Sequence, residues 1–349
     1  MNDMHRLGFG ARLLGGAALL AASSAAQDSR PEAASRPATT TRPATEDVVA
    51  FLRKGRVYTV GTTQGAVERM ASDFDLQYDR PLAWDADGKR LFCWLNPAGW
   101  DVGAIELASG AVVDLTRTHD DCRMARPSPD GSRIAFQRGG VGVCVMNADG
   151  SKARVVAPRG HRDAAPAWSP DGTRLAFMDL ESLDVGRVAT SVWVAPVDGG
   201  EPRRIVEHAD EPWWSADGAV VFALAARAPD GADLYSVPVD GAGPPKRLTF
   251  DGGAKSGLAF TADRARCAWL RTSGDGTPRL CVLDLRGGST PKEVAELTGR
   301  PHPPSWAPDG GRLAYTSGDD GSRSLWIMDV PAWNSIRVAD DVAWPVWRP

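Results

Sequence analysis

Residues 166–177 read PAWSPDGTRLAF, and variants of this phrase recur along the chain. An aromatic residue stands three places before an Asp, and a Gly usually follows, as in Trp84…Asp87-Gly88, Trp168…Asp171-Gly172, Trp214…Asp217-Gly218 and Trp306…Asp309-Gly310. In two further copies, around Asp130 and Asp263, Pro127 takes the aromatic place and Arg264 takes the Gly place. Successive repeat Asp residues are 43, 41, 46, 46 and 46 residues apart. A period of about 40 to 50 residues with short strands is typical of a β-propeller.

Each repeat carries four strand patterns. In the copy quoted above, strands are predicted over residues 166–168, 175–177, 192–195 and 203–206. The turn at 169–172 reads Ser-Pro-Asp-Gly, in which Pro presets φ and Gly supplies a positive φ. Helical periodicity appears nowhere in the body of the chain, so the fold class is all-β.

The two ends of the repeat region complement each other. Residues 46–72 contain three strand patterns, at 48–52, 57–60 and 66–70, but no first strand, whereas residues 343–349 form a lone first strand. Pairing them completes one blade and removes a sheet edge. First strands near residues 83, 126, 167, 213, 259, 305 and 346 predict a seven-bladed β-propeller of four-stranded antiparallel blades, closed by the N- and C-terminal strands. The alternative is six blades, if the Pro127 repeat forms none.

The first 45 residues differ from the rest. Residues 1–26 combine an early positive charge, an apolar run at 13–22 and small residues at 24–26, which predicts a signal peptide cleaved after Ala26. The apolar run is too short to span a membrane, so no span is expected after cleavage. Residues 27–45 form a Pro/Ala/Thr-rich linker expected to be disordered, and residues 46–349 form the propeller. We therefore expect a periplasmic or secreted protein.

The charge and composition narrow the function. The formal net charge is −4, and loss of the signal peptide, with two Arg and one Asp, would make it −5. A mildly acidic chain without a basic run argues against nucleic-acid binding. The sequence has no phosphate-binding loop, no Cys-x-x-Cys pair and no dinucleotide fingerprint, so no cofactor is predicted.

The five cysteines follow no metal spacing. Cys267 and Cys281 lie on two adjacent predicted strands at nearly matching distances from their turn, and an oxidising compartment would permit a disulfide between them. Packing as unpaired thiols is the preferred interpretation.

The repeat residues themselves have structural explanations. Blades of a propeller pack face to face, and the recurring aromatic is expected to fill the wedge between neighbours. A lone Asp before Gly in a tight turn usually caps backbone N–H groups, so calcium binding is not needed to explain the repeat Asp residues.

The phrase at 166–177, with Val145-Met-Asn-Ala-Asp-Gly150 between copies and Pro345-Val-Trp-Arg-Pro349 at the end, resembles the TolB-type propeller repeat. The resemblance covers residues 46–349 and implies a protein or peptide partner in the cell envelope. TolB proteins carry an N-terminal α/β domain and are usually read as six-bladed, whereas a short linker precedes the repeats here. We therefore expect a stand-alone TolB-like propeller rather than the TolB of the Tol–Pal system. Similar repeats precede prolyl-oligopeptidase-type hydrolase domains, but no Gly-x-Ser-x-Gly elbow with a partnered His is found here.

Candidate binding residues gather in the loops that lead into the first strands. The histidines of the expected mature chain lie 11, 10, 9 and 7 residues before a repeat Asp. Such loops collect on one face of a propeller, around its channel. The candidates are Asp79, Arg80, His119, Asp121, Arg123, His161, Asp163, His208, Asp210, Glu211, Lys255, Arg300, His302 and Asp341.

Three interpretations of this polar face remain open. The side chains belong to ordinary solvated loops, or they bind a protein or peptide, or the histidines hold a metal ion, as in propeller lyases that act on oligogalacturonate. We predict a monomeric, non-enzymatic scaffold that binds a protein or peptide partner, with no catalytic or metal-binding residues assigned. The alternative is a metal-dependent lyase or hydrolase with a His-lined channel site.

Overall fold

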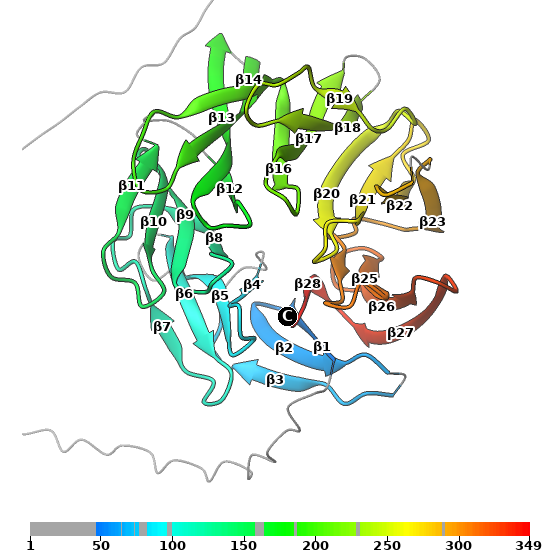
Figure 1. The fold of residues 1–349 in the computed structure, drawn as a ribbon. Helices are drawn as coiled ribbons and strands as arrows, with labels where there is room; N and C mark the ends of the chain where they lie inside the picture. Colours follow the sequence, from blue (N-terminus) through cyan, green and yellow to red (C-terminus); the bar gives the residue numbers. More distant parts are fainter. Residues whose placement is uncertain are drawn as a thin grey trace, which may run out of the picture. The chain divides into compact units, whose positions relative to one another are not determined.

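The structure, a computed structural model, describes residues 47–63, 65–72, 74–76, 82–95, 100–157, 164–184, 187–227, 231–287 and 290–349. The predicted signal peptide and linker lie outside these residues. Residues 45–349 form one compact unit. Within the described residues, the regular secondary structure consists of β-strands. They form seven four-stranded antiparallel sheets around a common axis (Figure 1).

Each sheet is one blade, and its first strand lies nearest the axis (Figure 1). Blade 1 contains β28 (Ala343–Trp347), β1 (Val48–Arg53), β2 (Arg56–Gly61) and β3 (Arg69–Ser72). Blade 2 contains β4 (Ala83–Trp84), β5 (Arg90–Leu95), β6 (Asp101–Glu106) and β7 (Val112–Asp114). Blade 3 contains β8 (Cys122–Pro127), β9 (Arg133–Arg138), β10 (Gly142–Asn147) and β11 (Arg154–Ala157).

The remaining blades repeat this order. Blade 4 contains β12 (Ala164–Trp168), β13 (Arg174–Asp184), β14 (Arg187–Pro196) and β15 (Arg203–Glu207). Blade 5 contains β16 (Ala209–Trp214), β17 (Val220–Arg227), β18 (Gly231–Pro238) and β19 (Lys246–Arg247). Blade 6 contains β20 (Ala254–Phe260), β21 (Arg266–Thr272), β22 (Pro278–Asp284) and β23 (Lys292–Glu296). Blade 7 contains β24 (Ser305–Trp306), β25 (Arg312–Ser317), β26 (Ser324–Asp329) and β27 (Asn334–Asp340).

The seven-bladed fold and its closure are confirmed. Strand β28 pairs antiparallel with β1, so that Trp347 lies opposite Val49 and Val346 lies opposite Ala50. The Pro127 repeat forms a complete blade, which excludes the six-bladed alternative. Some strand bounds differ from those predicted: β3 begins at Arg69 rather than residue 66, and β13 and β14 extend to 11 and 10 residues.

The repeat Asp caps its own turn, as expected. In the turn at 169–172, Asp171 Oδ1 accepts a hydrogen bond from the Thr173 amide at 3.0 Å, while Ser169 Oγ accepts one from the Arg174 amide at 2.9 Å. Gly172 has a φ of 67°, and Arg264, which replaces Gly in blade 6, adopts a φ of 57°. The turn geometry therefore survives the substitution, at the cost of a left-handed conformation that favours Gly.

Residue size is matched across each blade junction. The residue five places after the repeat Asp packs against the aromatic position of the next blade, and Ala50 has the equivalent place in blade 1, which lacks the repeat Asp. This residue is small where the aromatic is Trp. It is Phe where the next blade carries Phe, as Phe222 packs with Phe260. It is also Phe at position 92, where Pro127 stands in the aromatic place of the next blade. The pairs are Ala50/Trp84, Phe92/Pro127, Ala135/Trp168, Ala176/Trp214, Phe222/Phe260, Ala268/Trp306 and Ala314/Trp347. Close packing of the interior requires this exchange of volume.

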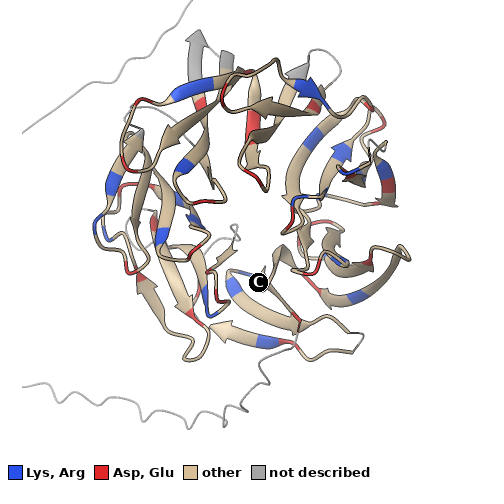
Figure 2. Cartoon of the chain, in the orientation of Figure 1, with Lys and Arg blue, Asp and Glu red and all other residues tan. Residues whose placement is uncertain are grey.

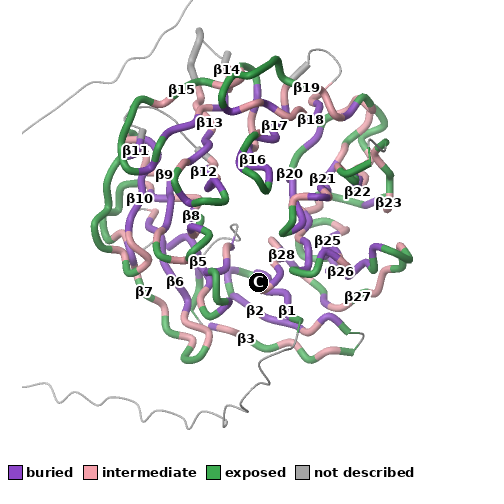
Figure 3. The backbone as a smooth tube through the Cα atoms, viewed as in Figure 1, coloured by how far each residue is buried: buried purple, intermediate pink, exposed green. Residues whose placement is uncertain are grey.

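The wedge tryptophans also tie neighbouring blades together by hydrogen bonds. The indole nitrogen of Trp168 donates to the carbonyl oxygen of Arg126 at 2.9 Å, and that of Trp306 donates to Ala259 at 3.1 Å. Arginines three places after the repeat Asp stack on the next blade's aromatic, as Arg174 does on Trp214 at 4.7 Å. Burial is concentrated in the first three strands of the blades, whereas outer strands such as β15 and β23 are largely exposed (Figure 3).

The first strands contain a bulge six residues before the repeat Asp. Met124, Ala165 and Glu211 occupy it with φ values of 54°, 51° and 46°, and the strand register shifts there. A bulge bends its strand and re-aims the adjacent side chains. Side chains near the axis are therefore oriented by this repeated irregularity.

The cysteines are unpaired and buried, as preferred. Cys267 lies opposite Leu283 and Cys281 lies opposite Trp269, so the two thiols are out of register. Burial raises the pKa of Cys281 to about 11.

Candidate functional site

The candidate residues that the structure describes lie toward one end of the blades. Because neighbouring strands run antiparallel, the loop before each first strand and the loop between the second and third strands emerge on the same face. We call this face the inlet face, and the opposite face, which carries the Asp-Gly turns, the turn face. Charged residues of both signs are distributed around the ring (Figure 2).

Asp101 and His119 form a pair at the inlet face between blades 2 and 3. Nδ1 of His119 lies 2.6 Å from Oδ2 of Asp101, whose side chain is fully buried while the imidazole is half-exposed. The same carboxylate accepts hydrogen bonds from Thr116 Oγ1 at 2.6 Å and from the Thr118 amide at 3.1 Å. Burial opposes ionisation of Asp101, but these hydrogen bonds outweigh it and lower its pKa. The pair fixes the imidazole and leaves Nε2 as its second polar atom.

Arg123 stacks against two tryptophans beside this pair. Its guanidinium carbon lies 5.6 Å from the ring centre of Trp94 and 5.5 Å from that of Trp100, and its Nε donates to Asp121. The two indole rings meet edge to face with centres 6.0 Å apart. The amide of Cys122 donates to the carbonyl oxygen of Trp100 at 2.7 Å, so the blade 2 hairpin is joined to blade 3. We call Trp94, Trp100, Asp121 and Arg123 the aromatic cluster.

The blade 5 candidates divide between solvent and structure. His208 is exposed at a φ of 54°. Glu211 accepts hydrogen bonds from the amides of Gly257 at 3.0 Å and Leu258 at 2.8 Å, so it joins blades 5 and 6. Burial, followed by the charge of Glu211, raises the pKa of Asp210 to about 6.

His302 is held between blade 7 and the first strand of blade 1. Its Nε2 lies 2.8 Å from Nη1 of Arg323, and its ring centre lies 4.5 Å from that of Trp344. Burial, followed by the charge of Arg323, lowers the pKa of His302 to about 4. Arg300 is exposed, and its carbonyl oxygen accepts a hydrogen bond from Nε of Arg323 at 2.9 Å.

Asp341 is partly exposed at the blade 7 to blade 1 connection. One of its carboxylate oxygens lies 3.6 Å from Nζ of Lys54. Its carbonyl oxygen accepts a hydrogen bond from Nε of Arg53 at 3.4 Å.

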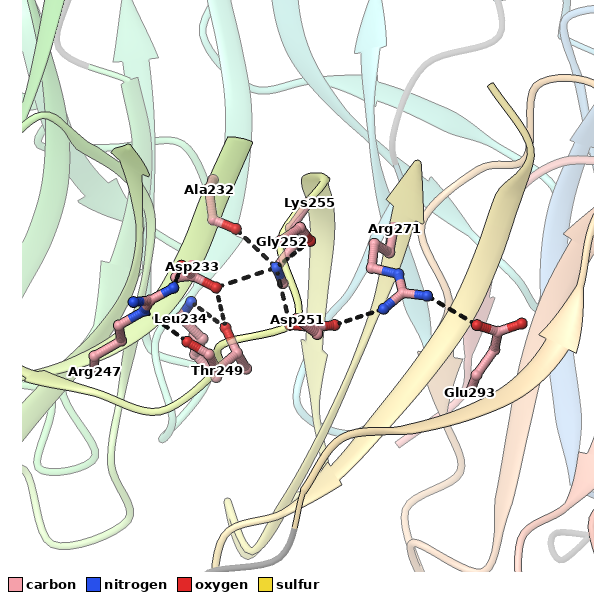
Figure 4. Close-up of polar contacts among 10 residues, drawn as sticks. All are labelled: Ala232, Asp233, Leu234, Arg247, Thr249, Asp251, Gly252, Lys255, Arg271 and Glu293. Carbon is pink, nitrogen blue, oxygen red and sulfur yellow. Dashed lines mark hydrogen bonds and ion pairs between the residues drawn. The ribbon is translucent and has the colours of Figure 1, made fainter. Parts of the chain in front are cut away.

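Lys255 is not at the surface. Its fully buried side chain lies between blades 5 and 6, where Nζ donates to the carbonyl oxygens of Ala232 at 2.9 Å and Gly252 at 2.8 Å (Figure 4). Nζ also pairs with the carboxylates of Asp233 at 3.3 Å and Asp251 at 3.1 Å. These contacts make Lys255 a link between blades, because a partner at the inlet face could not reach it in this conformation.

The network around Lys255 extends to both sides. Asp233 also pairs with Arg247 at 2.5 Å, and Asp251 pairs with Arg271 at 3.0 Å, which in turn reaches Glu293 at 2.9 Å (Figure 4). These alternating charges extend across blades 5 and 6.

Four of the predicted binding residues lie outside the part of the chain that the structure describes: Asp79, Arg80, His161 and Asp163.

Asp101 was not among the predicted binding residues, although a recurring Asp–Thr spacing in the sequence could have indicated it. Asp101 and Asp233 occupy equivalent places at the start of a third strand, and each accepts a hydrogen bond from a Thr about fifteen residues later. Phe250 was also missed. It is 71% exposed in the loop leading into blade 6, with Arg247 stacked 4.5 Å from its ring centre.

Within the described residues, no group of three or more His, Cys, Asp or Glu side chains is placed to hold a metal ion. His119 and His302 contact Asp101 and Arg323 respectively rather than each other. His161 lies outside the described part of the chain.

A cavity of about 400 Å³ lies on the turn face, away from the predicted residues. It is lined by the Asp-Gly turns of blades 2 and 3. Its charged lining residues are Asp85, Asp87, Lys89, Arg90, Glu106 and Asp130. Ion pairs of 3.0 Å for Arg90–Asp85 and 2.5 Å for Lys89–Asp87 satisfy part of this lining internally.

In the part of the chain that the structure describes, no helix is long and apolar enough to span a bilayer.

Comparison with known proteins shows partial relatives. No family model matches the chain. A segment of 209 residues, 53% of the chain, is 30% identical to Tricorn protease homolog 1 of Streptomyces coelicolor and spans 18% of that protein. A segment of 125 residues, 36% of the chain, is 30% identical to the Protein TolB homolog of Chlorobium luteolum and spans 27% of it. The chain thus matches well under two thirds of the length of either relative.

Solved structures resemble the chain more completely. TolB from Acinetobacter baumannii superposes with a TM-score of 0.58 at 18% identity, covering 77% of this chain and 68% of that one. An oligogalacturonate lyase in complex with manganese gives a TM-score of 0.64 at 12% identity, covering 85% and 84%. At these identities the likeness shows the propeller fold alone. The chain is therefore a seven-bladed β-propeller, and it resembles TolB proteins in its repeat phrases and over part of its sequence.

Proposed function

We propose that this propeller is an exported, monomeric, non-enzymatic scaffold that binds a protein or peptide partner through its inlet face. The partner would be a component of the cell envelope, and the protein would act in the periplasm or outside the cell after removal of residues 1–26. The candidate contacts are the aromatic cluster, His119, His208 and Asp210, together with Asp79, Arg80, His161, Asp163, Arg300, His302 and Asp341.

The observation that carries this proposal is the aromatic cluster. Trp, Tyr and Arg side chains contribute most of the binding energy at protein interfaces. Trp100 and Arg123 are partly exposed, yet the stacking on Trp94 and the bond to Asp121 hold them in place. Side chains already ordered before binding lose little conformational entropy when a partner arrives.

Further features on the same face support the proposal. Phe250 exposes an aromatic ring in the loop leading into blade 6, and Phe74, 45% exposed, does so in the loop leading into blade 2. His119 is oriented by a buried carboxylate, which gives a partner a fixed hydrogen-bonding group. Electrostatic and hydrogen-bonding groups on a rigid surface mainly confer specificity.

The proposal is tested by capture of a partner on immobilised protein. Envelope extract is passed over wild type, over a Trp100→Ala/Arg123→Ala variant and over a matched Trp333→Ala/Arg154→Ala control, in which both changes lie away from the inlet face. We expect one protein, identified by mass spectrometry, to bind to wild type and control but to be lost from the cluster variant. Equal capture by all three would contradict the proposal.

A further inference from the structure

Arg126 is a charged residue in a place that the repeat otherwise fills with uncharged residues. It stands four residues before the repeat Asp, on the first strand β8. The equivalent residues in the other blades are Ala83, Ala167, Trp213, Ala259, Ser305 and Val346. Three of these six are Ala, so the strand geometry does not require a long side chain at this place.

Arg126 lies on the strand of blade 3 that is nearest the propeller axis. Strand β8 is the innermost strand of blade 3, and its neighbour β9 covers its outer edge (Figure 1). Blades 2 and 4 pack against the two faces of the blade 3 sheet. Arg126 is nevertheless exposed. The solvent that reaches it therefore lies at the axis, since the other sides of the strand are covered.

No counter-ion accompanies Arg126 among the described residues. Its guanidinium donates to the carbonyl oxygen of Ala125 at 3.2 Å and makes no ion pair. Protein atoms around Arg126 lower its pKa by partial desolvation, although the side chain still reaches solvent, and no charged group contributes to the shift. An arginine that is partly desolvated without a carboxylate has unused hydrogen-bonding capacity, because the guanidinium offers five N–H donors.

A second arginine lies at the same end of the axis. Arg264 follows the first strand of blade 6, and β8 and β20 face each other across the axis (Figure 1). Its guanidinium carbon lies 5.1 Å from the ring centre of Trp213, the residue equivalent to Arg126 in blade 5. Burial lowers the pKa of Arg264, only partly opposed by Asp263, which pairs with Arg286. Arg126 and Arg264 thus lie at or just beyond the turn-side ends of their first strands, whereas Asp210 lies nearer the inlet-face end of its strand.

We propose that the turn-side end of the propeller axis binds a carboxylate of a peptide, and that Arg126 is the residue that anchors it. Guanidinium and carboxylate match in planar, bidentate geometry, and such charge-assisted bonds are about twice as strong as neutral ones. The inference deepens the proposed function and rests on it, since a peptide bound at the inlet face is the source of the carboxylate. It assigns Arg126 a binding role and Arg264 a supporting positive charge.

An NMR titration of the arginine Nε–H signals tests the anchor. The probe is N-acetyl-Gly-Gly-Gly with a free C-terminal carboxylate, and the control probe is the same peptide with a C-terminal amide. We expect the free carboxylate, but not the amide, to shift the Arg126 signal. Arg126→Ala should weaken binding of the carboxylate at least 10-fold, whereas Arg154→Ala, on the outermost strand of the same blade, should leave it unchanged. Arg126→Ala should fold, because Ala83, Ala167 and Ala259 occupy the equivalent places.

The outcomes separate the anchor from the proposed function. Equal affinity of wild type and Arg126→Ala, or no binding of the carboxylate, would overturn the anchor while leaving partner capture at the aromatic cluster intact. Tighter binding of inorganic phosphate than of the carboxylate would overturn the assignment to a peptide. Conversely, a Trp100→Ala/Arg123→Ala variant should retain the carboxylate titration even though it loses the captured partner. Failure of capture alone would reject the proposed function and not the anion site.

Discussion

The indole nitrogen of Trp214 donates a hydrogen bond to the carbonyl oxygen of Ala167, 3.0 Å away on the first strand of the preceding blade. The same ring packs with Ala176, whose small side chain leaves room for it. A repeat residue thus contributes both volume and a directional bond to a junction. Each blade junction stabilises the ring only if the side chains on its two sides match in size. The stability of one blade therefore depends on its neighbours.

Size matching at the junctions predicts the effect of exchanging residues. Ala135→Phe should lower the free energy of unfolding by at least about 1–3 kcal/mol, because Trp168 already fills that space. Phe92→Ala should cost about 3–5 kcal/mol through the cavity it leaves beside Pro127. Adding Pro127→Trp to Phe92→Ala should recover a substantial part of that loss. Urea denaturation of wild type and the three variants measures these differences, and failure of the double variant to recover stability would contradict the matching.

The buried Lys255 network predicts a large effect of removing one charge. Lys255→Met should cost about 3–5 kcal/mol of unfolding free energy, because Asp233 and Asp251 would each lose a buried partner. Lys54→Met is the matched control: its ammonium group is exposed and lies 3.6 Å from Asp341, so its loss should cost less than about 1 kcal/mol. Thermal and chemical denaturation report both values. Comparable effects of the two substitutions would show that Lys255 does not join the blades as described.

Asp210 and His302 predict opposite dependences of stability on pH. The pKa of Asp210 is raised to about 6, so the folded protein binds this proton more tightly and its stability falls as pH rises from about 4 to about 6. The pKa of His302 is lowered to about 4, so stability rises as pH increases from about 4 to about 6.5. The contribution of each group to the unfolding free energy is at most roughly 3 kcal/mol, and it is smaller where solvent screens the charge.

Single substitutions should reveal the two opposing terms. Asp210→Asn removes the contribution to stability that falls as the pH rises. The unfolding free energy of this variant should therefore rise more steeply with pH between 4 and 6 than that of wild type. His302→Gln should give the opposite change of slope. Denaturant midpoints measured across this pH range provide the slopes. Unchanged slopes in both variants would mean that neither pKa is shifted in the folded protein.

Ring closure predicts that the C-terminal strand is essential. Trp347 is 5% exposed and packs with Phe51 and Val49 of β1. Trp347→Ala should therefore cost about 3–5 kcal/mol, and deletion of residues 343–349 should prevent cooperative unfolding at the wild-type temperature. Deletion of the exposed Pro349 alone should have little effect. Calorimetry of the three variants tests this, and a wild-type transition in the long deletion would contradict closure.

The sequence predicted the architecture well because the fold is repetitive. The spacing of the repeat Asp residues and the lone strand at 343–347 were enough to predict seven blades and their closure. The candidate site was less predictable. The sequence position of Lys255, at the start of a first strand, resembled that of the exposed residues, but its side chain contacts the carboxylates of Asp233 and Asp251 in the interior. Such contacts depend on tertiary geometry and leave no local pattern.

Site-specific photo-crosslinking in living cells would show whether a partner binds at the inlet face. A photoreactive amino acid replaces Thr118 at the inlet face, Val113 on the outer strand of blade 2 or Asp87 on the turn face. We expect one discrete crosslinked partner from position 118 and none from positions 113 and 87. Crosslinks from position 113 or 87 with none from position 118 would contradict it.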